Sequence, residues 1–280
     1  MPSTALLRAA LLSPFKHPRP DAQPPRAHLT AALTPDPRHL AVYERVCGFA
    51  TGRDSIPLTY PHALAFPLAM RLMTARDFPL PLLGLVHTSI DITQHRALHP
   101  GEELQLDVHV RKLAPHRRGT EATVVTEAKA KDGTPLWESS STYLARHKTH
   151  GPKESRPRPE QPPTPHTPPT TETTWHLTSD LGRRYASVSG DRNPIHLHPL
   201  TARLFGFPRA IAHGMWTVAR CLAQHSADDP AHVHAHVHAH AEFKAPILLP
   251  ATVTYGSQGT TFELRGTKGQ LHIRGEVTPR

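Results

Sequence analysis

Hydrophobic and polar residues follow two different periods along this chain, and the changes of period predict where helices and strands lie. Apolar residues recur on a helical period over Leu64–Ala75. The four segments after it alternate apolar and polar residues, as half-buried antiparallel strands do: Leu85–Thr93, Glu103–Leu113, Glu121–Ala130 and Leu136–Ala145. Asp132-Gly133, a dipeptide typical of tight hairpins, separates the last two. The pattern therefore predicts one main helix followed by an antiparallel sheet.

The second part of the chain shows the same order of patterns. Ser179–Val188 is predicted to be a helix that Thr178 or Ser179 caps, and His213–Ala223 is predicted to be the main helix. Strands are expected to follow it at Ala231–Lys244, Ala251–Gln258, Thr261–Gly266 and Leu271–Val277. A long helix wrapped by a curved antiparallel sheet is the α+β hot-dog fold, so two such units in tandem predict a double hot-dog. A single sheet of this kind leaves an edge and an apolar face uncovered, and we expect the units to pack sheet to sheet.

Short sequence similarities support a duplication. Tyr43–Phe49 aligns with Tyr185–Asp191, and Pro61–Leu64 aligns with Ala212–Met215. Phe49 stands where the second copy has Asp191, so a duplicated first copy would have lost an acidic group. Chance similarity between two apolar segments is the alternative interpretation.

Proline marks the boundary between the halves. Eight prolines fall in residues 152–169, and such a segment has few backbone donors and favours extended polyproline structure. We therefore predict an N-terminal degenerate hot-dog domain over 1–150, a linker over 151–174 and a C-terminal domain over 175–280. The apolar run Ala5–Leu12 is expected to be a short surface helix, with a targeting segment as the alternative.

The segment Tyr185–His196 carries the candidate chemistry. It places the carboxylate of Asp191 five residues before the imidazole of His196, and Gly190 and Pro194 interrupt any regular helix between Tyr185 and His196. Alone, each of the two groups would be more typical of a turn or a cap; together in one turn, they predict an acid and a base aimed at one point. Gly214 lies at the start of the second main helix, whose first N–H groups lack intrahelical partners and can stabilise negative charge.

These residues match an ordered motif. Tyr185, Ser189, Gly190, Asp191, Asn193, Pro194, Ile195 and His196 are followed by Gly206, Phe207, Ile211, His213, Gly214 and Met215. The motif resembles that of the MaoC-like, R-specific enoyl-CoA hydratase/dehydratase family, although His198 stands where many members carry an acidic residue. The match proper covers about 30 residues, and looser similarity extends over most of 175–280.

The resemblance implies reversible hydration of trans-2-enoyl thioesters to R-3-hydroxyacyl thioesters, without a cofactor or a metal. Asp191 and His196 would hold the water and move its protons, while the N–H of Gly214 would face the thioester oxygen. Asn193 is also assigned to the catalytic group. A role in fixing the turn and orienting Asp191 and His196 is favoured over direct participation in the chemistry. The residues expected to bind substrate are Ser189, Tyr185, Ile211, His213 and Met215, with a structural role left open for His213.

Charge and cysteine content add expectations about partners. The net charge of +9 fits either a general compositional bias or attraction for an anionic carrier, such as coenzyme A or an acyl carrier protein. Nucleic-acid binding and a membrane span are not expected. Cys47 and Cys221 form no disulfide or zinc pattern, which suits a cytoplasmic protein. The paired halves predict a monomeric pseudo-dimer or a homodimer.

Three alternatives remain open from the sequence. The stripe of alternating histidines from His232 to His240 lacks nearby cysteines or spaced carboxylates, so it is interpreted as one face of a strand rather than a metal site. The second alternative is a hot-dog thioesterase, which would hydrolyse the thioester and would not need Asp191 and His196 in this sequence context. A catalytically silent protein that binds acyl thioesters is the third alternative.

Overall fold

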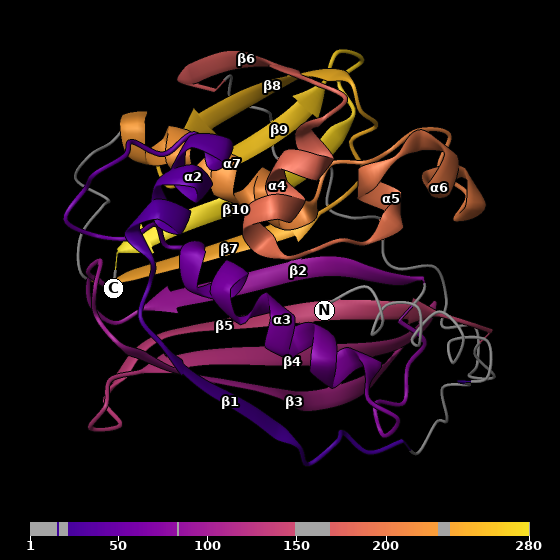
Figure 1. The fold of residues 1–280 in the computed structure, drawn as a ribbon. Helices are drawn as coiled ribbons and strands as arrows, with labels where there is room; N and C mark the ends of the chain where they lie inside the picture. Colours follow the sequence, from indigo (N-terminus) through magenta and orange to yellow (C-terminus); the bar gives the residue numbers. More distant parts are fainter. Residues whose placement is uncertain (1–15, 17–21, 83, 149–168, 229–235, 280) are drawn as a thin grey trace.

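The computed structural model describes residues 16, 22–82, 84–148, 169–228 and 236–279. Its strands form a single antiparallel ten-stranded sheet in the order β1-β3-β4-β5-β2-β7-β10-β9-β8-β6 (Figure 1). The first half supplies the strands from β1 to β2 in this order: β1 (His28–Leu33), β3 (Leu104–His116), β4 (Gly119–Lys129), β5 (Pro135–Arg146) and β2 (Leu85–Gln94). The second half supplies the rest: β7 (Val237–Phe243), β10 (Leu271–Pro279), β9 (Thr261–Gly266), β8 (Ala251–Gln258) and β6 (Thr171–Leu177).

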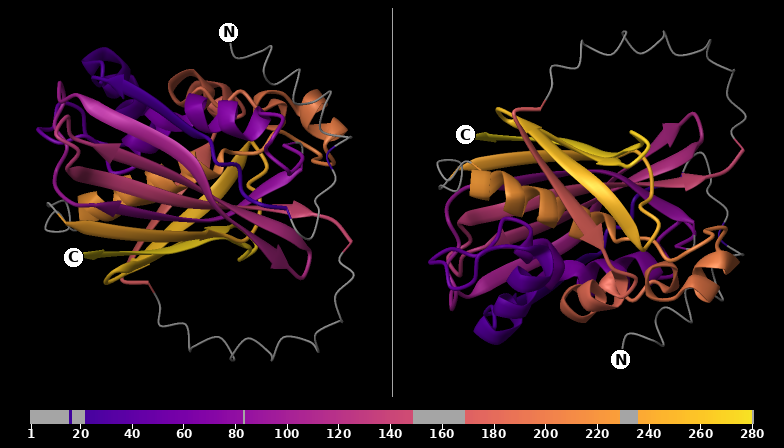
Figure 2. Two further views of the ribbon diagram at one scale, coloured as in Figure 1. Left: turned by 90° about the horizontal axis from the view of Figure 1, so that it is seen from below. Right: turned by 90° about the horizontal axis from the view of Figure 1, so that it is seen from above.

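The two halves join edge to edge rather than face to face. Residues Ser89–Gln94 of β2 pair with Val237–Glu242 of β7 in antiparallel register. The expectation of two sheets packed on each other is therefore wrong. Backbone hydrogen bonds between β2 and β7 satisfy the edge of each half-sheet, and the combined sheet is strongly twisted (Figure 2).

The helices cover one side of this sheet (Figure 2). The first half contributes α2 (Pro37–Cys47) and α3 (Tyr60–Thr74), and the second contributes α4 (Leu181–Ser189), α5 (Pro194–Leu197), α6 (Pro199–Leu204) and α7 (Gly214–Asp228). The main helices predicted over Leu64–Ala75 and His213–Ala223 are α3 and α7. Helix α3 begins earlier, at Tyr60, and α7 extends farther, to Asp228.

The remaining sequence expectations divide by region. The hairpin at Asp132-Gly133 lies between β4 and β5, where Gly133 has a φ of 89°. Strand β6 begins at Thr171, so the predicted linker of 151–174 extends too far; Trp175 and Leu177 of β6 are buried against β8. The predicted helix Ala5–Leu12, most of the proline-rich segment and the start of the strand predicted over Ala231–Lys244 lie outside the described residues.

A single hydrophobic core serves both halves. Buried side chains of α2 and α3 belong to the same cluster as those of α4 and α7. Tyr43 of α2 and Tyr185 of α4 are fully buried, with ring centroids 6.3 Å apart. Trp216 of α7 donates a hydrogen bond from Nε1 to the Val46 carbonyl, 2.9 Å away, at the end of α2. The site at the end of α4 is therefore held by elements of both halves.

None of the helices in the described ranges combines the length and the apolar character needed to cross a lipid bilayer.

Candidate functional site

A tight turn after α4 positions Asp191. Gly190 ends the helix in the left-handed region, with a φ of 74°, and its N–H donates to the Ala186 carbonyl at 3.1 Å. Ser189 Oγ donates to the Tyr185 carbonyl at 2.9 Å and accepts from the Asp191 N–H at 3.2 Å. The Asp191 carboxylate accepts from the Asn193 N–H at 3.1 Å through Oδ1. One carboxylate oxygen is thus held by the turn, and Oδ2 is left for other contacts.

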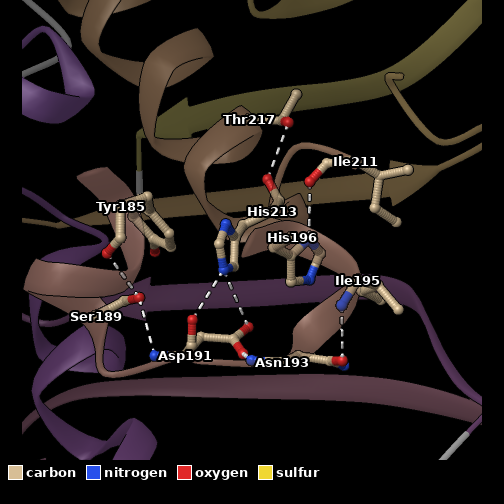
Figure 3. Close-up of polar contacts among 9 residues, drawn as sticks. All are labelled: Tyr185, Ser189, Asp191, Asn193, Ile195, His196, Ile211, His213 and Thr217. Atoms are coloured by element: carbon tan, nitrogen blue, oxygen red, sulfur yellow. Dashed lines mark hydrogen bonds and ion pairs between the residues drawn. The ribbon is translucent and has the colours of Figure 1, made fainter. Parts of the chain in front are cut away.

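The short helix α5 positions His196. Asn193 caps it by accepting the Ile195 N–H at 3.4 Å, and Pro194 begins it. The His196 Nδ1–H donates to the Ile211 carbonyl at 2.9 Å (Figure 3). Because a carbonyl only accepts, this bond selects the tautomer in which Nε2 is an acceptor. Nε2 of His196 can therefore accept a proton, and the ring is held in a fixed orientation.

Helices α4 and α5 touch at a glycine. A Cβ at Gly182 would lie 1.9 Å from the His196 carbonyl oxygen, so a larger residue cannot occupy this position without moving α5. Gly182 consequently allows the close approach that keeps His196 near the Asp191 turn.

His213 lies between the pair and helix α7. Its Nε2–H donates to the Asp191 carbonyl at 3.0 Å and lies 3.8 Å from Asp191 Oδ2 (Figure 3). Its ring stacks on His196 with 3.7 Å between centroids, and its carbonyl accepts from the Thr217 N–H and hydroxyl, both at 3.1 Å. The side chain is only 2% exposed. His213 therefore holds the Asp191 backbone and packs against the His196 ring.

Burial shifts the pKa values of the pair toward each other. Burial raises the pKa of the Asp191 carboxyl, and the nearby His196 charge and the Asn193 N–H oppose the rise only in part. Burial lowers the pKa of His196, which the Asp191 charge partly opposes. Burial also holds the pKa of His213 well below its usual value, with His196 adding to the effect. A carboxyl and an imidazole whose proton affinities approach each other can exchange protons with a common substrate.

Asp191 and His196 line a cavity of about 770 Å³ to which both halves contribute. Among the residues predicted to bind substrate, Tyr185, Ser189, Ile211 and Met215 line it as well, as does Gly214. A Cβ at Gly214 would lie 2.9 Å from Phe243 Cε1, so the glycine leaves room between the first turn of α7 and that ring. His213 is not among the described lining residues.

The first half supplies cavity residues that the sequence analysis missed. His62, Phe66, Met70 and Met73 lie on one face of α3, and His87 and Tyr143 line the cavity from β2 and β5. The spacing of four, four and three residues along α3 was a visible signal. No local pattern marked His87 or Tyr143. Basic residues are also present in the lining: Arg117, Arg118, Arg146 and Lys244.

Within the described residues, two clusters present ligand types for a metal. Atoms of Asp191, His196 and His213 lie within 4.8 Å of one another, but His196 Nδ1 and His213 Nε2 already donate to backbone carbonyls. His28, Asp107 and His109 form a second such group at the sheet edge.

The histidine stripe has the predicted alternation where it is described. His238 and His240 are partly exposed between the buried residues Val237, Ala239 and Ala241, and His240 contacts Asp91 at 2.8 Å. His232 and His234 lie outside the described residues.

Comparison with known proteins gives the family. Residues 160–271 match the model of the MaoC-like domain. The 3-hydroxyacyl-thioester dehydratase X of Mycobacterium tuberculosis is 38% identical over 277 residues, which cover 97% of this chain and 96% of that protein. The chain belongs to the MaoC-like dehydratase family. It is accordingly an enzyme of the hydro-lyase class.

Solved structures of this family share the fold. The crystal structure of HtdX from Mycobacterium tuberculosis at 2.4 Å resolution has a TM-score of 0.76 and 34% identity, covering 91% of this chain and all of that one. A MaoC-like dehydratase from Phytophthora capsici has a TM-score of 0.74 at 20% identity, covering 92% of this chain and 96% of that one. The expectation of an α+β double hot-dog is confirmed, and the motif around Asp191 lies in the part that matches the family model.

Proposed function

We propose that this MaoC-like enzyme interconverts trans-2-enoyl and R-3-hydroxyacyl thioesters by adding or removing water. The observation that carries the proposal is the presence of a carboxylate, a neutral imidazole and the start of α7 around one cavity. Dehydration of a 3-hydroxyacyl thioester is also the activity for which the M. tuberculosis relative is named.

The chemistry assigned to the pair is removal of a proton from water and delivery of a proton to C2. In the hydration direction, water held between Asp191 and His196 loses a proton to one of them as its oxygen bonds to C3. The pair then delivers this proton to C2, which returns both groups to their starting state, and dehydration runs through the same steps in reverse. Negative charge develops on the thioester oxygen in between. The Gly214 N–H, at the positive end of α7, is assigned to stabilise it.

The other predicted site residues are assigned to positioning. Asn193 and Ser189 hold the turn through the hydrogen bonds to Ile195 and Asp191. Tyr185 and Met215 form cavity wall, and the Ile211 carbonyl orients His196. His213 holds the Asp191 backbone.

In this proposal the two halves of the chain supply different parts of the site. Residues 175–280 supply the catalysts, and the first half supplies the wall against which the acyl chain lies, mainly through α3. The thioester is carried by coenzyme A or an acyl carrier protein, whose phosphates suit the arginines at the cavity. Because β2 already pairs with β7, one chain makes the complete site as a pseudo-dimer.

Crotonyl-CoA hydration, followed as loss of the enoyl absorbance, tests the proposal. Asp191→Asn and His196→Ala should each lower kcat by about 10²–10⁴-fold with little change in KM, because each removes a positioned acid or base. The double variant should be little worse than the worse single variant, since the two groups act on one water.

His236→Ala is the control, because His236 is exposed before β7. Release of free thiol without hydration would favour a thioesterase. Wild-type rates in folded Asp191→Asn would refute the assigned site and favour a silent binding protein.

A further inference from the structure

Among the histidines of the first half that line the cavity, His62 and His87 are the two with a buried, unpartnered Nε2 atom in the described part of the chain. His62 lies on α3 in line with Phe66, Met70 and Met73, and His87 lies near the start of β2. Neither has a part in the proposed hydration, for which Asp191 and His196 suffice. The presence of polar groups beside an otherwise apolar α3 face therefore calls for a separate explanation.

Both rings are held in place by neighbouring side chains. His62 Nδ1 lies 3.2 Å from the Ser139 hydroxyl oxygen. The His87 ring stacks on Tyr143 with centroids 4.5 Å apart and packs against Phe243 at 4.7 Å. Because these contacts restrict rotation of the rings, the Nε2 atom is the nitrogen that each ring keeps available for another partner.

That nitrogen is unsatisfied in each ring. The Nε2 atoms of His62 and His87 are buried and have no hydrogen-bond partner within the described part of the chain. Burial lowers the pKa of His62 to about 4 and that of His87 to about 3, so both rings are neutral at physiological pH. Leaving a buried polar atom unpaired is costly, which makes a partner from outside the chain favourable.

Strand β5 gives a measure of the distance between His62 and Arg146. Arg146, at the end of β5, is exposed, whereas Ser139 is 1% exposed and contacts His62. Seven residues of strand separate the two, or about 23 Å at 3.3 Å per residue. An acyl thioester whose phosphates lie near Arg146 would therefore direct the far part of its acyl chain toward His62.

We propose that His62 and His87 bind a neutral oxygen group, a hydroxyl or a keto oxygen, on the acyl chain of the substrate. This inference rests on the proposed hydratase function. A buried carboxylate would require a nearby cation. The lysine and arginine residues of the described lining are Arg117, Arg118, Arg146 and Lys244, and the arginines among them are already assigned to the phosphates. The ligand beside His62 and His87 is therefore proposed to be neutral. Neutral imidazoles can accept from a hydroxyl or donate to a carbonyl.

The test uses trans-2-octenoyl-CoA and its four derivatives with a hydroxyl at C5, C6, C7 or C8. For the wild type, the best hydroxylated isomer should have a kcat/KM about 10-fold above that of the plain chain, because a site built for a hydrogen bond discriminates against an analogue without one. In His62→Leu/Ser139→Ala, which removes both members of the buried pair, this ratio should fall at least about 10-fold.

His176→Leu is the matched control, because His176 contacts the Thr252 hydroxyl at 3.1 Å but is exposed on β6 and should leave the ratio unchanged. A wild type that prefers the plain chain to every hydroxylated isomer would overturn the inference, even if the double variant does not fold. An unchanged ratio in the folded double variant would also overturn it. Failure to hydrate crotonyl-CoA at all would instead count against the proposed function.

Discussion

Five imidazoles at or beside the cavity have pKa values lowered by burial: His62, His87, His196, His213 and His272. In the unfolded chain each would titrate near its usual pKa of about 6.5. The folded state therefore binds fewer protons than the unfolded state below that pH. The stability from keeping these groups neutral is fully present above pH 6.5 and is lost as pH falls toward the folded-state pKa values.

Acid should consequently destabilise this protein as the pH falls below about 6.5. For His62, with a folded-state pKa of about 4, lowering the pH from 7 to 5 should cost about 2 kcal/mol of unfolding free energy. Urea denaturation of the wild type and of His62→Gln at both pH values measures this. The variant should lose about 2 kcal/mol less than the wild type. Equal losses in the two proteins would show that His62 is not kept neutral by folding.

At the scale of elements, the turn from α4 to α5 joins local backbone geometry to the site. Gly190 has positive φ, and a Cβ there would meet only Pro67 Cγ, at 3.7 Å. Any cost of a side chain at this position therefore comes from backbone conformation rather than from a clash. Because Asp191 follows directly, relaxation of that strain would move the carboxylate.

Gly190→Ala should lower the unfolding free energy by about 1 kcal/mol and also reduce kcat. Gly190→Asn should lose less stability, since asparagine tolerates the left-handed region. The control is Gly269→Ala, at a φ of 75° with no atom within 4 Å of the added Cβ. It should show a similar stability loss with wild-type kcat. If Gly190→Ala keeps full activity while losing stability, the turn does not position Asp191.

At the scale of the whole molecule, the halves depend on each other. The β2–β7 pairing closes two half-sheets into one, and the Trp216–Val46 hydrogen bond ties α7 to α2. The cavity has walls from both halves. Neither half-sheet would keep its edge or its part of the core covered alone.

A chain cut between the halves should therefore remain one particle. With a protease site introduced at Lys153, the two fragments should co-elute after cleavage, unfold in a single transition and retain crotonyl-CoA hydration, because the β2–β7 pairing and the Trp216–Val46 hydrogen bond do not depend on an intact connection. Size-exclusion chromatography and thermal denaturation measure this. Separate elution of folded fragments would contradict a shared core and a shared site.

Much of this organisation could be predicted from the sequence because it is encoded by neighbours in the chain. The alternation in Leu85–Thr93 and the helical period in Leu64–Ala75 report which face of each element is buried. The turn chemistry of Gly190 to Pro194 likewise depends on adjacent residues. The order of the two main helices and of the strands that follow them, and the motif with Asp191 and His196, were therefore accessible without coordinates.

The tertiary structure alone decided how these parts meet. Edge-to-edge pairing of Asp91 with His240 joins residues 149 positions apart, and the alternation within either strand does not specify its partner. The support of Asp191 by His213 and the unsatisfied nitrogens of His62 and His87 depend on packing between distant elements. Local patterns state which side chains must be buried, whereas the complementary fit of the whole core determines what they are buried against.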